Sequence, residues 1–372
     1  MRKRLWKLHS WIGLFCAIGL LIIGLSGSVL VFHEEISSAL HPDVTLNAPQ
    51  DEASTRIPTS ELTQSVESKF PDFWIRGWLF NTDADKRDRA YVMDRGGDEW
   101  HILYVDPYTG ETADRPLDYE ETLYGWFVQL HYTFFADHIG MIVAAILALG
   151  FLFLSVSGIY LHRPFFKAFF RIRWKTSSRI FFSDFHKAIG IASVPFNFIL
   201  GFTGAYWNIS HVAHELIEHS HEEEHEIESP YQEYGDSIDQ LATIADQQIA
   251  GYALNYIYFP TESDPTFYLY GQHPEAGIIN SLYGSTIWIS AENGQVKHVT
   301  NLKESGWWAK VVDAFEPLHF GGFGGLFTKT LWCLAGLSPA ALSITGAMMY
   351  FKRKRPKRLR QKPEASLESQ SA

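Results

Sequence analysis

The sequence contains very little cysteine. Only Cys16 and Cys333 occur among its 372 residues, and both fall inside long apolar runs. The polar segments of the chain therefore have no disulfides, and ordinary hydrophobic cores must stabilise them even in an oxidising compartment. The chain also lacks a C-x-x-C-H sequence, which excludes covalent attachment of a c-type haem.

Familiar catalytic and nucleotide-binding signatures are missing as well. The chain has no Walker loop, no dinucleotide fingerprint and no convincing Ser-His-Asp pattern. The glycine-rich stretch 321–325 neither follows a strand pattern nor carries the Lys-Ser/Thr pair of a phosphate loop, so we interpret it as a bend. The net charge of -11 and the lack of a basic patch argue against nucleic-acid binding.

Long apolar stretches are abundant by contrast. A transmembrane helix needs about 20 consecutive apolar residues, and four stretches reach that length: 11–32, 139–161, 188–209 and 331–351. The mean hydropathy of -0.08 conceals them because two long polar segments dilute the average. The sequence therefore predicts a membrane protein with four spanning helices. The first stretch is too long for a signal peptide and ends without a small-residue cleavage site, so we expect it to be retained.

The distribution of charge predicts the orientation of these helices. Residues 1–10, 162–187 and 352–372 together carry 19 Lys or Arg and 3 acids, whereas residues 33–137 and 210–330 carry 12 basic residues and 39 acids. Because basic segments stay in the cytoplasm, both termini and the 162–187 loop are expected there. The two long polar segments are then expected on the outer side.

Two motifs occur twice with the same spacing. His9 precedes Gly24-x-x-Gly27 as His186 precedes Gly201-x-x-Gly204, and His131 precedes Ser155-x-x-Gly158 as His319 precedes Ser343-x-x-Gly346. Repeats at a fixed spacing indicate an internal duplication. The outer segments repeat too, each reading as a helix (60–70 and 237–250) followed by short strands, so we expect one small α+β unit from each.

Several short motifs in this order resemble the PepSY-associated transmembrane family. They are Leu8-His-x-Trp-Ile-Gly13, Val105-Asp-Pro-x-Thr-Gly-Glu111, Leu130-His-Tyr132, Gly158-x-x-Leu-His162, Asp184-Phe-His186 and Leu318-His-Phe-Gly321. Members of that family include bacterial inner-membrane proteins of iron acquisition, some similar to a di-haem ferric-siderophore reductase. The resemblance covers residues 2 to 355. One position departs from it, since Asn197 stands where relatives carry a further histidine.

The predicted fold is therefore an α-helical membrane protein: a four-helix bundle from an internal duplication, with two extracytoplasmic α+β PepSY-like domains. The expected segments are the cytoplasmic N-terminus 1–10, first helix 11–32, first outer domain 33–125, interfacial segment and second helix 126–161, basic loop 162–187, third helix 188–211, His/Glu-rich extension and second outer domain 212–316, glycine-rich bend and fourth helix 317–351, and cytoplasmic tail 352–372.

Histidines near both ends of the predicted helices are the candidate site. An imidazole at membrane depth is costly enough that a functional role is the first hypothesis. The axial-ligand candidates for two b-type haems are His9, His131, His162, His186 and His319, with His33 and His211 in reserve. The repeat suggests that His9 faces His186 on the inner side and that His131 faces His319 on the outer side. His162 breaks this symmetry, since its counterpart is Tyr350. The alternative for each is an ordinary interfacial histidine, and the neighbouring glycines could equally serve helix packing.

A second cluster follows the third helix: His211, His214, Glu218, His221 and His225. Steps of three and four place these side chains on one stripe of a helix, where they could bind a transition metal. A charged, solvated helix end is the simpler interpretation, because Glu222, Glu223, Glu224 and Glu226 surround the stripe.

The leading functional hypothesis is a membrane protein that uses two b-type haems to reduce a ferric siderophore or another ferric complex on the periplasmic side, with an electron donor that the sequence does not identify. Two alternatives stay open. One is a non-catalytic PepSY membrane protein that binds or regulates a periplasmic partner. The other is a metal-binding accessory of an iron permease that uses the 211–225 stripe.

Overall fold

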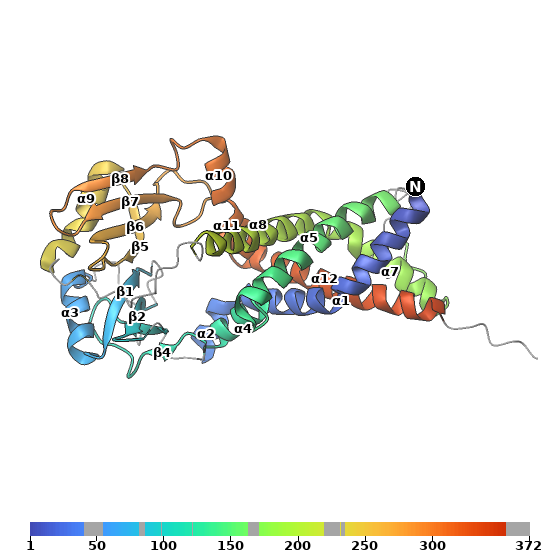
Figure 1. Ribbon diagram of the computed structural model, residues 1–372, viewed down its shortest axis with the longest axis horizontal. Coiled ribbons are helices and arrows are strands. Elements are labelled where there is room, and N and C mark those ends of the chain that lie inside the picture. The colour runs from blue at the N-terminus through green and yellow to red at the C-terminus, as the bar shows by residue number, and fades with distance from the viewer. Residues whose placement is uncertain are drawn as a thin grey trace, which may run out of the picture.

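The computed structural model separates a helical bundle from a β-sheet domain, which lies beyond one end of the bundle (Figure 1). The N-terminus lies at the opposite end of the bundle. The structure describes residues 1–40, 55–81, 86–97, 99–120, 122–162, 171–218, 231 and 235–354.

The sheet domain contains one antiparallel sheet of eight strands in the order β4-β3-β2-β1-β5-β6-β7-β8. The strands are β1 Phe73–Leu79, β2 Asp88–Asp94, β3 Trp100–Val105, β4 Leu117–Asp118, β5 Ala253–Tyr258, β6 Thr266–Gln272, β7 Ser285–Ser290 and β8 Val296–Thr300. The sequence analysis expected short strands in both outer segments, and β4 and β8 are the strands with the weakest sequence signal. Those two are short or carry polar residues at the sheet edges, so their apolar pattern is weak.

The two outer segments share this sheet instead of forming separate units. Strand β1 of the first segment pairs with β5 of the second, with Trp78 opposite Ile257. The order of strands is symmetric about this pairing, since β2 and β6, β3 and β7, and β4 and β8 occupy equivalent positions on either side. One hydrophobic core contains residues of both segments, including Trp78 and Ile257. The expected α+β units are therefore joined edge to edge.

The two faces of the sheet have different environments. Helices α3 (Thr59–Lys69) and α9 (Leu241–Gln248) contribute to the core and lie on the side away from the bundle (Figure 1). Alternation along β2 places Ala90 and Val92 in that core and turns Arg89 and Tyr91 to the other face. The strand register places further aromatic residues on the same face as Arg89 and Tyr91: Tyr104, Tyr256, Tyr258, Tyr268, Tyr270 and Trp288. The sheet therefore presents a tyrosine-rich face opposite its helices.

Long apolar helices form the bundle. They are α1 Arg2–Leu30, α5 Asp137–Leu161, α7 Ser178–Ala192, α8 Val194–Glu218 and α12 Gly325–Lys354, with the shorter α2 His33–Leu40, α4 Leu123–Tyr132 and α11 Phe315–Phe320 and the 3-10 turn Gly322–Gly324. Helix α10 Trp307–Asp313 leads from the sheet domain into α11, and the 3-10 turn Gly235–Gln240 packs against α3 and α9 of the sheet domain. Helix α1 packs against both α12 and α5, and α5 packs against α8. Small residues let α1 and α12 approach each other closely: a Cβ on Gly24 of α1 would lie 2.8 Å from the backbone oxygen of Gly336 of α12.

The predicted third helix, 188–211, is wrong as a single straight element. Helices α7 and α8 meet at an angle of 66°. The physical reason is Pro195, because its ring nitrogen cannot donate to the carbonyl of Ile191 and the ring clashes with that turn. Asn197 stabilises the break: its side chain donates to Ser193 Oγ at 2.8 Å and accepts from Ser338 Oγ of α12 at 2.8 Å.

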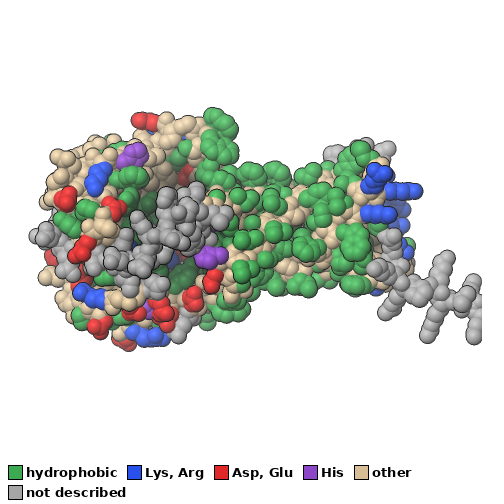
Figure 2. Space-filling model, viewed as in Figure 1, with side chains coloured by type: hydrophobic (Ala, Val, Ile, Leu, Met, Phe, Trp, Pro, Cys, Tyr) green, Lys and Arg blue, Asp and Glu red, His purple; other side chains and the backbone are tan. Residues whose placement is uncertain are grey.

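The surface of the bundle is that of an integral membrane protein. Three helices are long and apolar enough to cross a bilayer, or four if α7 and α8 together count as one span. Large apolar side chains cover the outside of the bundle, and basic side chains gather at its far end (Figure 2). Phe15 is 76% exposed and Ile139 is 72% exposed, which is unfavourable in water and favourable against lipid.

Candidate functional site

Four histidines of the repeated motifs make the same contact. Each Nδ1 atom lies within hydrogen-bond distance of a Ser or Thr hydroxyl on a neighbouring helix. The pairs are His9 with Ser157 (2.7 Å), His131 with Ser26 (3.0 Å), His186 with Thr345 (2.8 Å) and His319 with Thr203 (2.6 Å). Matched positions of the sequence repeat therefore have matched partners.

The hydroxyl groups determine which ring nitrogen carries the proton. Ser26 donates its hydrogen to Ile22 O at 2.8 Å, and Thr203 donates to Ile199 O at 2.8 Å. Ser157 and Thr345 likewise donate to carbonyls of their own helices, Leu154 O at 3.2 Å and Ala341 O at 2.7 Å. A hydroxyl has a single hydrogen, so each oxygen must accept from Nδ1–H. In a neutral ring the Nε2 lone pair then remains available as a ligand.

Glycine provides the space beside each of these rings. An added Cβ would meet the imidazole Cε1 atom at 2.8 Å from Gly27, 3.8 Å from Gly158, 3.7 Å from Gly204 and 3.5 Å from Gly346. These are the last glycines of the four motif copies. Other glycines of the motifs serve helix packing instead, as Gly24 does against α12. Some motif glycines therefore make room for a histidine ring, and others serve helix packing.

The outer pair consists of His131 on α4 and His319 on α11. Their ring centroids are 6.3 Å apart, with an angle of 76° between the ring planes. Trp207 of α8 lies beside His319, at 5.1 Å between centroids. Two short helices that precede different spans therefore bring these two histidine rings close together, with their planes nearly perpendicular.

The inner pair consists of His9 on α1 and His186 on α7, which lie close enough to interact electrostatically. His162 follows the last residue of α5 and lies near Lys187. Among the described residues, no hydrogen bond or ring contact joins His162 to His9 or His186. The structure thus brings His9 and His186 within electrostatic range of each other, whereas His162 interacts with Lys187.

The reserve candidates lie outside both pairs. His33 stacks on Tyr124, with centroids 4.5 Å apart, and its buried Nδ1 atom has no hydrogen bond. Burial lowers the pKa of His33 to about 4, although Glu34 opposes this shift, so the ring is neutral at neutral pH. His211 is exposed and hydrogen-bonds through Nδ1 with the hydroxyl of Tyr132.

The proposed 211–225 metal stripe is only partly visible. His211 and His214 lie on α8, and both are exposed. His221, His225 and the side chain of Glu218 lie outside the described residues. The stripe therefore stays a prediction from the sequence.

An ion-pair network connects the bundle to the sheet domain. Glu34 of α2 lies 3.4 Å from Lys86 Nζ and 3.8 Å from Arg89 Nη2 of β2, and 3.8 Å from Lys329 Nζ of α12. Lys329 also pairs with Glu35 at 2.7 Å. The tyrosine-rich face of the sheet, which includes Arg89, is thus held near the outer end of the helices.

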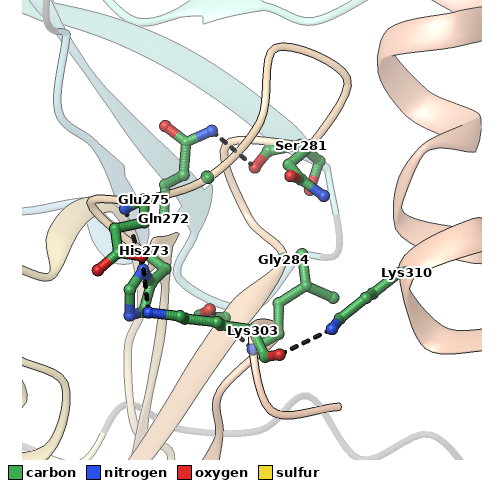
Figure 3. Close-up of a pocket in the computed structure, with 11 residues that line it drawn as sticks. Gln272, His273, Glu275, Ser281, Gly284, Lys303 and Lys310 are labelled. Carbon is green, nitrogen blue, oxygen red and sulfur yellow. Dashed lines mark hydrogen bonds and ion pairs between the residues drawn. The ribbon is translucent and has the colours of Figure 1, made fainter. Parts of the chain in front are cut away.

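Two cavities differ in character. One of about 400 Å³ lies between α1, α4 and α12, is lined mainly by apolar residues and includes Ser26, the partner of His131. The other, about 200 Å³, lies in the sheet domain (Figure 3). Its lysines already have partners, because Lys303 Nζ pairs with Glu275 at 2.7 Å and Lys310 Nζ donates to Lys303 O at 2.7 Å.

A comparison with known protein families matches residues 6–353 to the PepSY-associated TM region. The chain belongs to this family. The match covers the bundle and the sheet domain together, and it confirms the resemblance that the short motifs indicated. A search of curated proteins finds no match for the chain.

Sequence reasoning missed the four hydroxyl partners in this PepSY-associated protein. A signal for them was present, since Ser26 and Thr203 both stand two residues after the first glycine of the repeated pair. Ser157 and Thr345 both directly precede the last glycine of the other motif. A hydroxyl at the same repeat position beside a histidine motif points to a shared partner.

Proposed function

We propose that this chain is an inner-membrane electron-transfer protein that holds two b-type haems and reduces ferric siderophores or other ferric complexes on the periplasmic side. The observation that carries the proposal is the set of four Nδ1 contacts with hydroxyls that already donate elsewhere. This arrangement makes Nε2 the free ligand atom of each histidine in both pairs.

The donor set fits the axial coordination of haem. Iron in b-type haem takes imidazole ligands, and a ligating histidine usually donates its other N–H to an oxygen that fixes its orientation. Ser26, Ser157, Thr203 and Thr345 would supply that second contact. His131 and His319 would hold one haem, and His9 and His186 the other. An internal duplication accounts for the matched contacts.

The spacing of the outer pair also fits. Two imidazoles that would hold one haem between them need their ring centres about 6 Å apart, given metal–nitrogen bonds of about 2 Å. The ring centroids of His131 and His319 are 6.3 Å apart. An apolar groove lies on the other side of Ser26, the hydroxyl partner of His131, and is lined by residues of α1, α4 and α12. Haem supplies the one-electron chemistry when bound, while the protein contributes ligands, orientation and limited exposure.

The orientation follows from charge. Basic side chains lie at the end of the bundle that carries the N-terminus, and the acidic sheet domain lies at the other end (Figure 2). The positive-inside rule places that basic end in the cytoplasm. The sheet domain would then be periplasmic, and the ion pair between Arg89 and Glu34 holds its tyrosine-rich face near that end of the bundle. Ferric complexes bound by oxygen donors would be reduced there, and the lower charge of Fe(II) weakens their coordination.

Absorption spectroscopy of the detergent-purified chain tests the haem assignment. We expect Soret and α bands that change on reduction with dithionite, and a haem content of two per chain by the pyridine haemochrome method. His298→Gln, an exposed change in β8, serves as the control and should keep both haems. Protein that is folded and supplied with haem during expression, yet shows no reducible b-type bands, would refute the proposal.

A reduction assay tests the direction of the reaction. Protein in proteoliposomes, with a reductant enclosed and a ferric siderophore outside, should produce Fe(II) that ferrozine detects outside. His319→Ala should abolish this signal, because the outer pair is the one beside the sheet domain. Equal Fe(II) production by wild-type and His319→Ala vesicles would contradict the proposed direction.

A further inference from the structure

A separate group of ligand-type side chains lies at one end of the strands that form the β4 edge of the sheet. Asp94 ends β2, Glu99 directly precedes β3, His101 lies on β3, and Asp118 ends β4. The β-ladders align them, since His101 pairs in register with Asp118, while Trp100, next to His101, pairs with Met93, next to Asp94. None of these residues belongs to the histidine pairs of the bundle.

The imidazole of His101 is oriented by one carboxylate. Its Nδ1 atom lies 2.6 Å from Asp118 Oδ1, so Nδ1 carries the proton and donates it to the carboxylate. His101 is only 7% exposed, and its Nε2 atom is buried without a hydrogen bond. This nitrogen is directed toward Asp94, whose Oδ2 atom lies 3.4 Å away.

The same side of the ring faces two carboxylates. The ligand atoms of Asp94, Glu99 and His101 all lie within 4.8 Å of one another. In a neutral ring with Nδ1 protonated, Nε2 is a lone pair that faces two further acceptors. Three acceptors without a donor repel one another, and a cation between them removes the repulsion.

We propose that Asp94, Glu99 and His101 bind a divalent transition-metal ion, with Asp118 as the residue that positions His101. Imidazole and carboxylate together favour Zn²⁺, Fe²⁺ or Co²⁺ over Ca²⁺ and Mg²⁺, which prefer oxygen ligands alone. The carboxylate–histidine pair is the arrangement that raises the basicity of a metal-binding imidazole.

The number of ligands indicates an exchangeable site. Three protein ligands leave coordination positions open, whereas structural sites usually close all four. Asp94 and Asp118 are partly exposed, and Glu99 is exposed, so an ion can enter from solvent and the two metal-facing carboxylates can close on it. The assignment is independent of the haem proposal, because no residue of either histidine pair takes part.

Metal titration of the full-length chain in detergent tests this site. After treatment with a chelator, the protein is titrated with Zn²⁺ by calorimetry and with Co²⁺ by absorption spectroscopy. We expect one Zn²⁺ site that His101→Asn removes, relative to wild type. Asp118→Asn should weaken binding at that site by 10-fold to 100-fold while keeping its stoichiometry, because it removes only the orienting contact. Asp114→Asn, a nearby exposed carboxylate outside the group, is the matched control and should bind as wild type does.

A second variant guards against misfolding, since His101 is buried in the domain. Glu99→Gln changes an exposed side chain, so the unfolding temperature without metal should stay the same. The increase in unfolding temperature that Zn²⁺ produces in wild type should shrink in this variant. Identical Zn²⁺ stoichiometry and affinity in wild type, Glu99→Gln and His101→Asn would overturn the proposal.

Discussion

The inner and outer histidine pairs use the same contact in different settings. His9 and His186 lie on long helices, and their hydroxyl partners belong to other bundle helices. His131 and His319 lie on the short helices α4 and α11; α4 follows strand β4, and α11 follows strand β8 and helix α10. Helix packing alone therefore positions the inner pair, whereas the outer pair also depends on how the sheet domain folds. A change in the sheet domain should therefore affect the outer pair more than the inner pair.

Removal of a ligand should have the largest effect and should separate the pairs. Under the haem assignment proposed above, His319→Ala would remove one of the two histidines that hold the outer haem, so we expect haem content to fall from two to one per chain. His9→Ala should remove the other haem, with different spectral bands lost. His162→Ala should keep both, because its ring does not contact either inner histidine. Loss of a haem in His162→Ala and its retention in His9→Ala would replace the symmetric inner pair with an asymmetric one.

Changes to the hydroxyl partners should have the next largest effect. Thr203→Val on the outer side and Thr345→Val on the inner side keep the shape of the side chain and remove the acceptor for Nδ1–H. Loss of such a partner typically costs 10-fold to 100-fold in metal affinity. Each variant should lower haem affinity by about that factor and shift the midpoint potential of its own haem only. Redox titration of both variants measures this, with Thr300→Val in β8 as the control. Unchanged potentials would mean that these hydroxyls do not orient ligands.

Alanine substitutions of two glycines should affect the two histidine pairs differently, because the space between glycine and imidazole ring differs. A Cβ at Gly27 would lie 2.8 Å from His131 Cε1, whereas one at Gly158 would lie 3.8 Å from His9 Cε1. Gly27→Ala must therefore displace His131, at about 1–3 kcal/mol, while Gly158→Ala meets only ordinary van der Waals contact. The outer haem should bind more weakly in the first variant, and the inner haem should be unaffected in the second. Haem dissociation rates measured with apomyoglobin as acceptor check this, and equal effects at the two positions would contradict it.

The smallest effect should be a pH dependence specific to the outer side. Burial, assisted by Asp313, raises the pKa of Glu316 from 4.5 to about 7. The folded state therefore binds this proton more tightly than the unfolded state does. The resulting stabilisation is fully present below about pH 4.5 and is lost as the pH rises through 7. For a partly buried group this amounts to about 2 kcal/mol. Thermal unfolding of wild type and Glu316→Gln at pH 5 and pH 8 measures the difference, which should be smaller in the variant. The same pH dependence in both proteins would assign it to other groups.

Several features of the fold were predictable because their signals are local. Helices α1, α5 and α12 follow from the length of their apolar runs, and Gly110 and Gly294 have the positive φ values, 74° and 69°, that glycine adopts readily. Pairing of the motif histidines followed from equal spacing in the repeat. The bend at Ser193 was missed because the apolar run continues through it, although Pro195 marked the position.

The sequence by itself determined the spans, the asymmetry of charge and the histidine motifs, because each depends on composition or spacing along a single segment. Only the tertiary structure decided that β1 pairs with β5, that four hydroxyls meet four histidines, and that Asp118 turns His101 toward Asp94. Such contacts join residues far apart in the chain. Strand register and helix packing fix them, and neither can be read from one segment alone.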